Sequence, residues 1–137
     1  FSILKYYAED RVLLEYGQRS RNDIISLCNK YNLIHNEVVQ GFYKSSNKYL
    51  PFDLHFITKK TKFTVTDGMR ETCRTHIGLN LVREIFKFYC PTTARFILDP
   101  FCGMGYTAQV AKENNKIFRG NELNGKRLEK TIHRLAI

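Results

Sequence analysis

The sequence contains no long apolar run and no pairing pattern among its cysteines. No stretch approaches the length of a membrane span, and the chain does not open on a secretory signal peptide. The four cysteines, Cys28, Cys73, Cys90 and Cys102, are scattered, which argues against the disulfide framework of a small secreted domain. We therefore expect reduced thiols in an intracellular protein, cytoplasmic or nuclear, without a membrane partner.

Acidic residues are few relative to basic ones. The 137 residues include 22 lysines and arginines against 13 acids, which gives a formal net charge of +9. Such an excess favours a polyanionic partner, and nucleic acid in particular. The basic run of Lys59, Lys60 and Lys62 is either a solvated loop or an edge that contacts phosphate.

The segment from Phe96 to Ala108 is typical of a nucleotide-binding strand, loop and helix. Its apolar start at 96–98 predicts a short strand buried on both faces, which Asp99 ends. Gly103 and Gly105 then allow a tight turn beside a ligand. A helix and a second strand follow, and Glu122 comes at the tip of that strand. A carboxylate about 20 residues after a glycine loop is where such folds hold ribose hydroxyls.

The loop Asp99-Pro-Phe-Cys-Gly-Met-Gly resembles the Asp-Pro-Phe-x-Gly-x-Gly cofactor loop of S-adenosylmethionine-dependent DNA methyltransferases of the amino class. Those enzymes methylate the exocyclic nitrogen of adenine or cytosine. Segments 75–86 and 120–135 are similar to the helix before this loop in circularly permuted members and to the strand tip and helix after it. Met104 and Tyr106 depart from the usual pattern of small residues and Thr or Ser.

The resemblance implies an α/β, Rossmann-like methyltransferase fold, complete or partial, with S-adenosylmethionine as the cofactor and DNA rather than RNA as the partner. It suggests a mixed α/β region over residues 1–70 and a cofactor-binding βαβα unit over 71–137. It places the glycine loop at the methionine part of the cofactor, Glu122 at the ribose hydroxyls and Asp99 near the amino group. The full set of residues implied at the cofactor is Thr75, His76, Asp99, Pro100, Phe101, Cys102, Gly103, Gly105, Glu122 and Leu123.

The sequence lacks the catalytic tetrapeptide of this family, in which Asp, Asn or Ser precedes Pro-Pro and an aromatic residue. The three prolines, Pro51, Pro91 and Pro100, are all isolated. In permuted members the catalytic half precedes the cofactor half, so we expect it in an upstream domain or a partner chain. The isolated chain is then inactive. The alternative is a non-catalytic, methyltransferase-like subunit that binds nucleic acid.

Two other interpretations stay open at this stage. Segment 12–20 with its following helix resembles the end of a SET-type protein lysine methyltransferase, in which Tyr16 would lie near the methyl-transfer channel. Cys73, His76 and Cys90 could supply part of a zinc site, although structural zinc sites use four ligands, so we expect no metal. If the isolated chain were active, Asn36 and Asp53 would be the first residues to test.

The N-terminal half carries weaker signals. A strand over 11–16, a helix capped by Ser20 and a strand over 37–43 are expected. Residues 45–48 predict a loop, and Asp67-Gly68 predicts a turn.

Overall fold

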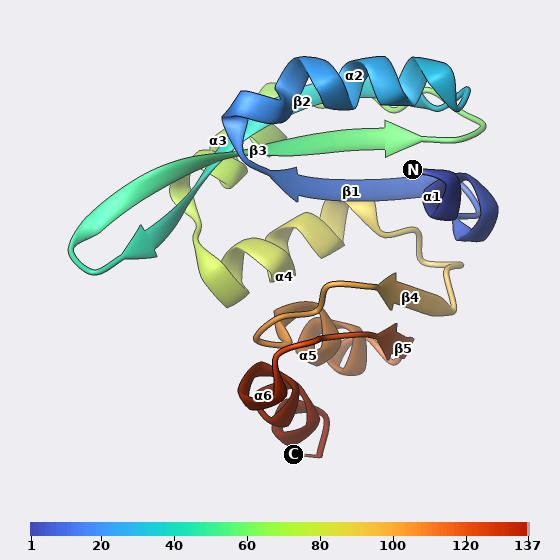
Figure 1. The fold of residues 1–137 in the computed structure, drawn as a ribbon. Coiled ribbons are helices and arrows are strands. Elements are labelled where there is room, and N and C mark those ends of the chain that lie inside the picture. Colours follow the sequence, from blue (N-terminus) through green and yellow to red (C-terminus); the bar gives the residue numbers. More distant parts are fainter. Residues whose placement is uncertain (137) are drawn as a thin grey trace. The chain divides into compact units, whose positions relative to one another are not determined.

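The computed structural model describes residues 1–136 and forms two compact units, Phe1–Ile77 and a second that begins at Gly78 (Figure 1). This boundary lies later than the division after residue 70 that the sequence suggested, because helix α3 (Asp67–Thr75) is bound to the first unit. The Arg70 guanidinium donates two hydrogen bonds to the Glu37 carboxylate on the sheet, at 2.6 and 2.7 Å. Within the described residues no helix has the length and apolar character needed to cross a membrane.

The first unit is built on a three-stranded antiparallel sheet in the order β1-β3-β2. The strands are β1 (Arg11–Tyr16), β2 (Ile34–Ser45) and β3 (Lys48–Thr58). The central strand β3 is buried without interruption from Phe52 to Thr58, whereas β1 and β2 are only partly covered. Helix α1 (Ser2–Tyr7) precedes β1, and a short 3-10 turn (Gln18–Ser20) leads into helix α2 (Arg21–Lys30).

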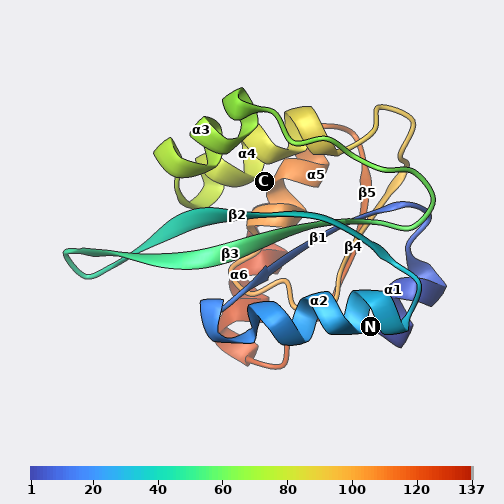
Figure 2. The same cartoon turned by 90° about the horizontal axis from the view of Figure 1, so that it is seen from above.

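Helix α2 packs on the sheet through a small apolar cluster. Ile24 and Cys28 lie on its buried face and pack with Leu33 and Ile57. Figure 2 shows α2 running along the three strands. The expected strand at 11–16 and helix after Ser20 are confirmed, but the Ser20 side chain makes no capping hydrogen bond.

The turn expected at Asp67-Gly68 is wrong, since these residues begin α3. Thr66 is the N-cap instead, and its hydroxyl oxygen accepts a hydrogen bond from the Met69 backbone N–H at 3.2 Å. Asp67 lies in the first turn, where its charge is favourable next to the helix N-terminus.

The second unit alternates helices and strands: α4 (Gly78–Tyr89), β4 (Phe96–Asp99), α5 (Tyr106–Glu113), β5 (Ile117–Gly120) and α6 (Gly125–Ala136). Strands β4 and β5 pair in parallel, with Asp99 opposite Gly120. Helix α5 connects them and contacts α4 and α6 on either side, and its Ala108, Val110 and Ala111 are buried. The small alanines let neighbouring elements approach closely.

One face of the two-stranded sheet is exposed. Phe96 is 55% exposed, Leu98 52% and Ile117 46%, so the prediction that residues 96–98 form a strand buried on both faces is wrong for the described structure. The reason is that, within the described part of the second unit, no element covers this face of β4 and β5. Side-chain exposure still alternates along β4, because Ile97, which lies between the two exposed residues, is half-buried.

Candidate functional site

The loop between β4 and α5 has a backbone that its hydrogen bonds fix at several points. The Asp99 carboxylate accepts a hydrogen bond from the Phe101 backbone N–H at 3.0 Å, which closes a turn directly after the strand. The Cys102 backbone N–H donates to the Asn121 carbonyl at 3.0 Å, and the Asn121 N–H donates to the Asp99 carbonyl at 3.1 Å. The loop after β4 and the segment after β5 are therefore bound to each other.

Gly105 cannot be replaced without strain. Its φ of +83° is in the left-handed region, and an added Cβ would lie 2.8 Å from Thr131 on α6. The Thr131 side chain is buried there, and its hydroxyl donates to the Gly103 carbonyl at 3.0 Å. Gly103 also has a positive φ, of +53°. The predicted glycine loop is thus present, and its shape depends on direct contact with α6.

Asp99 and Glu122 are brought together because parallel strands end at the same edge of a sheet. Burial raises the pKa of Asp99 above its usual range, and the nearby negative charge of Glu122 raises it further. Hydrogen bonds from the Phe101 N–H and the Thr107 hydroxyl act in the opposite direction. A partly buried carboxylate with a second carboxylate nearby suits a ligand that brings positive charge or several hydrogen-bond donors.

Two apolar side chains of the predicted site point into solvent. Phe101 is 84% exposed and Leu123 is 95% exposed, one on each of the two segments that the Cys102–Asn121 bond joins. Cys102 is buried, and its sulfur lies 3.9 Å from the Thr131 hydroxyl oxygen. Cys102 therefore packs behind the loop, while Phe101 and Leu123 are available to contact a ligand.

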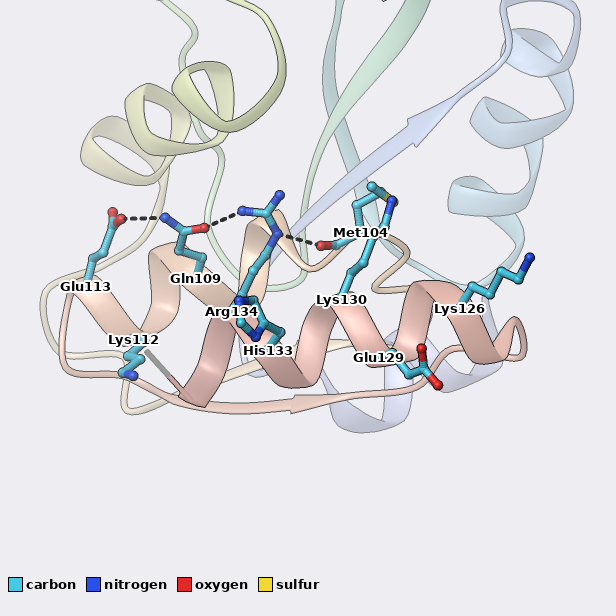
Figure 3. A pocket seen from close by; sticks show the side chains of 9 residues that line it. All are labelled: Met104, Gln109, Lys112, Glu113, Lys126, Glu129, Lys130, His133 and Arg134. Carbon is cyan, nitrogen blue, oxygen red and sulfur yellow. Dashed lines mark hydrogen bonds between the residues drawn. The ribbon is translucent and has the colours of Figure 1, made fainter.

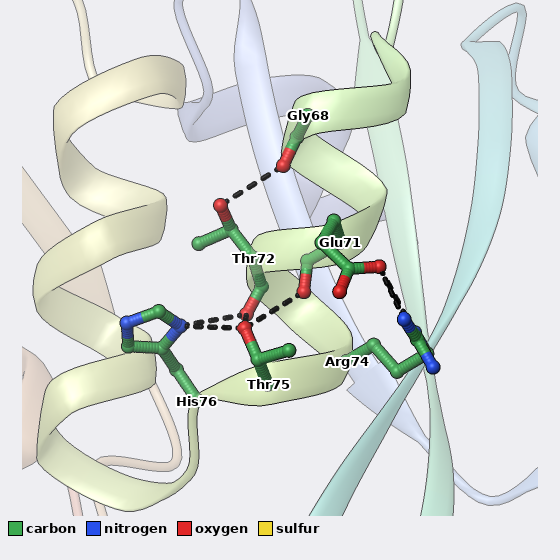
Figure 4. Close-up of polar contacts among 6 residues, drawn as sticks. All are labelled: Gly68, Glu71, Thr72, Arg74, Thr75 and His76. Atoms are coloured by element: carbon green, nitrogen blue, oxygen red, sulfur yellow. Dashed lines mark hydrogen bonds and ion pairs between the residues drawn. The ribbon is translucent and has the colours of Figure 1, made fainter.

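Thr75 and His76 lie at the C-terminal end of α3, in the first unit. Figure 4 shows the Thr75 hydroxyl donating to the Glu71 carbonyl at 2.9 Å, and the His76 Nδ1 lying 3.0 Å from the Thr72 carbonyl oxygen. Both side chains thus have hydrogen-bond partners on the backbone near the end of the helix. The other residues predicted at the cofactor all lie in the second unit, so a role of Thr75 and His76 there stays a prediction.

Solved structures share this fold. The chain superposes on the crystal structure of the methyltransferase M1.HpyAVI with a TM-score of 0.72 and 18% identity, over 93% of this chain and 73% of that one. A complex of M1.HpyAVI with S-adenosylmethionine matches equally well, over 75% of its chain. A proposed DNA modification methylase from Thermus thermophilus matches with a TM-score of 0.66 and 16% identity, over 92% of this chain and 69% of that one.

The chain has the fold of these methyltransferases. No protein-family model matches it, and no curated protein matches it. The Rossmann-like α/β fold class is thereby confirmed. The matched structures lend no support to the SET-type alternative.

One lysine of the basic run 59–62, Lys59, forms hydrogen bonds that stabilise the fold. The Lys59 ammonium group donates to the backbone carbonyls of Lys5 and Ala8, at 2.5 and 3.2 Å. Asp10 accepts hydrogen bonds from the Lys59 and Lys60 backbone N–H groups at 3.1 and 2.7 Å, which holds the turn after β3. The Lys60 and Lys62 side chains are exposed and stay candidates for phosphate contact.

An open depression of about 1230 Å³ lies along α5 and α6 (Figure 3). Arg134 crosses it, donating to the Met104 carbonyl at 2.8 Å and to the Gln109 side chain at 2.6 Å. Its lining carries both signs of charge and includes none of the residues predicted at the cofactor. The bonds of Arg134 instead support the glycine loop from the side of α6.

A buried polar cluster in the first unit was missed by the sequence analysis. Asp53 and His55 of β3 are fully buried, and Arg21 of α2 donates two hydrogen bonds to the Asp53 carboxylate, at 2.8 and 2.7 Å. The His55 Nδ1 lies 2.8 Å from the His35 Nε2. The ion pair with Arg21 holds the pKa of Asp53 below its usual range. The sequence held a signal for this cluster: Asp53 and His55 are two residues apart in a strand, so their side chains must lie on the same face of the sheet.

The two residues named as fallback catalytic candidates, Asn36 and Asp53, both have structural partners. The Asn36 amide donates to the Thr58 hydroxyl at 3.0 Å, and its oxygen accepts from the Phe63 N–H at 2.9 Å. These bonds lie where the β2–β3 register shifts between His35 and Glu37, so Asn36 supports a β-bulge. Among the described residues, no cluster of three or more potential ligands is placed to hold a metal ion.

Proposed function

We propose that this chain is the cofactor-binding part of an S-adenosylmethionine-dependent methyltransferase that acts on the exocyclic amino group of adenine or cytosine in nucleic acid, with DNA preferred over RNA. The catalytic tetrapeptide is supplied by an upstream domain or a partner chain. The observation that carries the proposal is the strand-tip pair of Asp99 and Glu122 next to a loop with two glycines at positive φ, in a fold shared with structures solved with S-adenosylmethionine.

The cofactor offers the positive charge and the hydrogen-bond donors that the Asp99 and Glu122 carboxylates require. S-adenosylmethionine carries a sulfonium, an ammonium group and a ribose diol, and when bound it supplies an electrophilic methyl group. Glu122 would accept both ribose hydroxyls, because a carboxylate has two acceptor oxygens. Asp99 would face the ammonium group, which offsets the burial and the charge repulsion from Glu122 that raise the pKa of Asp99.

The remaining loop residues shape and close the site. Gly103 has a positive φ and room where a Cβ would lie, so a ligand can approach the backbone there, whereas Gly105 leaves its Cβ position clear for Thr131 of α6. Phe101 and Leu123, both highly exposed, would cover apolar parts of the ligand and exclude water from it. Burial of these two side chains on binding gives a driving force that does not depend on charge.

Calorimetric titration of S-adenosylmethionine and of its demethylated product tests the site. Wild type should bind both saturably, and Glu122→Gln should weaken binding by about 1–3 kcal/mol, the range for lost hydrogen bonds at a buried polar group. Glu129→Gln is the matched control, because Glu129 is an exposed acid on α6 outside the proposed site. Equal affinity of the Glu122 and Glu129 variants with wild type would remove Glu122 from the site.

Transfer itself is tested by tritium incorporation into mixed oligonucleotides. The chain alone should give none, because the transfer also requires a group that orients the amino nitrogen and holds the flipped base. Adding a polypeptide that has the methyltransferase fold and carries the Pro-Pro-aromatic tetrapeptide should give methyl transfer. Robust turnover by the chain alone would contradict this assignment, and cofactor binding without any restorable activity would favour the non-catalytic subunit.

A further inference from the structure

The hairpin of β2 and β3 continues well beyond the end of β1. Strand β1 pairs with β3 only as far as Tyr16 opposite Asp53, whereas β2 and β3 stay paired to Ser45 opposite Lys48. Residues 41–52, here named the ribbon, therefore form a two-stranded extension with no third strand among the described residues. Figures 1 and 2 both show it running out past β1.

The ribbon exposes rings and ammonium groups and has no carboxylate. Tyr49 is 60% exposed and Tyr43 46%, and the Lys44 and Lys48 side chains are exposed as well. No Asp or Glu occurs from residue 41 to residue 52. About half or more of each tyrosine side chain thus lies outside the core.

The strand register places one ring and one ammonium group on each face. Tyr43 is opposite Leu50, and Ser45 is opposite Lys48, so Tyr43 and Lys48 share a face. Lys44 is opposite Tyr49, and this pair occupies the other face. Each face thus carries one exposed aromatic ring and one ammonium group.

The ring of Tyr43 packs against the ring of Phe52. The Phe52 ring lies 6.1 Å from it, centroid to centroid, and is itself buried. Phe52 can lie against the strand because Gly41 has no side chain: a Cβ at Gly41 would be 2.9 Å from the Phe52 ring. Tyr43 is therefore held as a platform rather than left free in solvent.

We propose that the ribbon is a nucleic-acid-binding arm, in which Lys44 and Lys48 contact phosphates and Tyr43 and Tyr49 stack on unpaired bases. Stacking on aromatic side chains and ammonium contact with the backbone are the two interactions by which proteins hold single-stranded nucleic acid. A partner of this chemistry is favoured by the absence of acids on the ribbon and by the net charge of +9. The inference rests on the proposed function for its choice of substrate, but its geometry belongs to the first unit alone.

Fluorescence anisotropy of labelled single-stranded and duplex oligonucleotides, measured with the full chain over a range of salt concentrations, tests the arm. Tyr49→Ser should weaken binding to single strands by roughly 5- to 150-fold, the range for one lost base stack, with little change in salt dependence. The double variant Lys44→Gln/Lys48→Gln should flatten the slope of log K against log salt by about 0.7 for each lost contact with a single strand.

Lys5→Gln/Lys30→Gln is the charge-matched control, because both lysines are exposed on the first unit outside the ribbon. The control should keep the wild-type slope. Equal slopes for the two double variants, or wild-type affinity of Tyr49→Ser, would overturn the proposal. A change of oligomeric state in Tyr49→Ser with unaltered oligonucleotide binding would also overturn it, since the ribbon would then be a protein contact.

Cofactor calorimetry on the same variants separates this inference from the proposed function. The ribbon variants should bind S-adenosylmethionine as wild type does. Loss of oligonucleotide affinity in these variants supports the arm even where no variant or wild type binds the cofactor, a result that would refute only the proposed function.

Discussion

Mild acid should destabilise the first unit through His55. This side chain is fully buried in β3, and among the described residues its Nε2 has no hydrogen-bond partner. Burial, together with the charges of His35 and Arg21, lowers the pKa of His55 from 6.5 to about 4, against the opposing effect of the Asp53 charge. The folded chain therefore resists a proton that the unfolded chain accepts.

The sign and the size of the effect follow from these two pKa values. The contribution of His55 to stability is fully present above pH 6.5 and is lost as the pH falls from 6.5 to 4, because in that window only the unfolded chain binds the proton. With these values the linkage relation gives a loss of about 2 kcal/mol between pH 7 and pH 5, and about 3 kcal/mol by the lower end of the window.

Urea unfolding at a series of pH values, followed by circular dichroism, measures this loss. His55→Gln should flatten the dependence between pH 7 and pH 5, because glutamine takes up no proton, whereas the exposed-site control His133→Gln should retain it. Titration of the histidine ring resonances in wild type gives a second readout that requires no variant to fold. An unchanged pH dependence in His55→Gln, or a His55 midpoint near 6.5, would refute the reasoning.

Three further substitutions have effects that the contacts predict. Gly105→Ala should lower stability by at least about 2 kcal/mol in thermal unfolding, because it adds left-handed strain and a clash with Thr131, whereas Gly125→Ala, with open space around it, should be nearly neutral. Thr131→Val should cost about 1 kcal/mol for the lost hydrogen bond to Gly103, and an unchanged melting temperature would show that this bond is dispensable. Asp53→Asn should cost about 2 kcal/mol through its bonds to Arg21, and the loss should disappear in an Arg21→Met background.

Sequence reasoning was most successful where the chemistry is local. The spacing of the glycines and of Asp99 determined the strand, the turn and the helix that follows, because φ values above zero and a strand-ending carboxylate depend on few neighbours. The position of Glu122 at the strand tip followed from the same reasoning. The role of Thr131 did not, because a residue on α6 supports Gly103 and Gly105 only once the helix has packed.

The errors arose where distant contacts override local preference. Asp67-Gly68 is a turn signal in isolation, but the Thr66 cap and the ion pair between Arg70 and Glu37 stabilise a helix there. Lys59 counted as one charge of a basic run, yet its ammonium group binds carbonyls of a segment far away in sequence. Burial of strand residues 96–98 could not be read from their hydrophobicity, since it depends on which elements cover each face.

The exposed face of β4 and β5 also affects how the protein behaves at high concentration. An apolar strand with an unpaired edge is a template for association with a second chain. Here two cations flank it: the guanidinium groups of Arg95 and Arg119 lie 5.8 and 6.0 Å from the Phe96 ring centroid. Two such surfaces repel each other while those charges are unscreened. Raised ionic strength should therefore promote aggregation of this protein, and dilute salt should keep it dispersed.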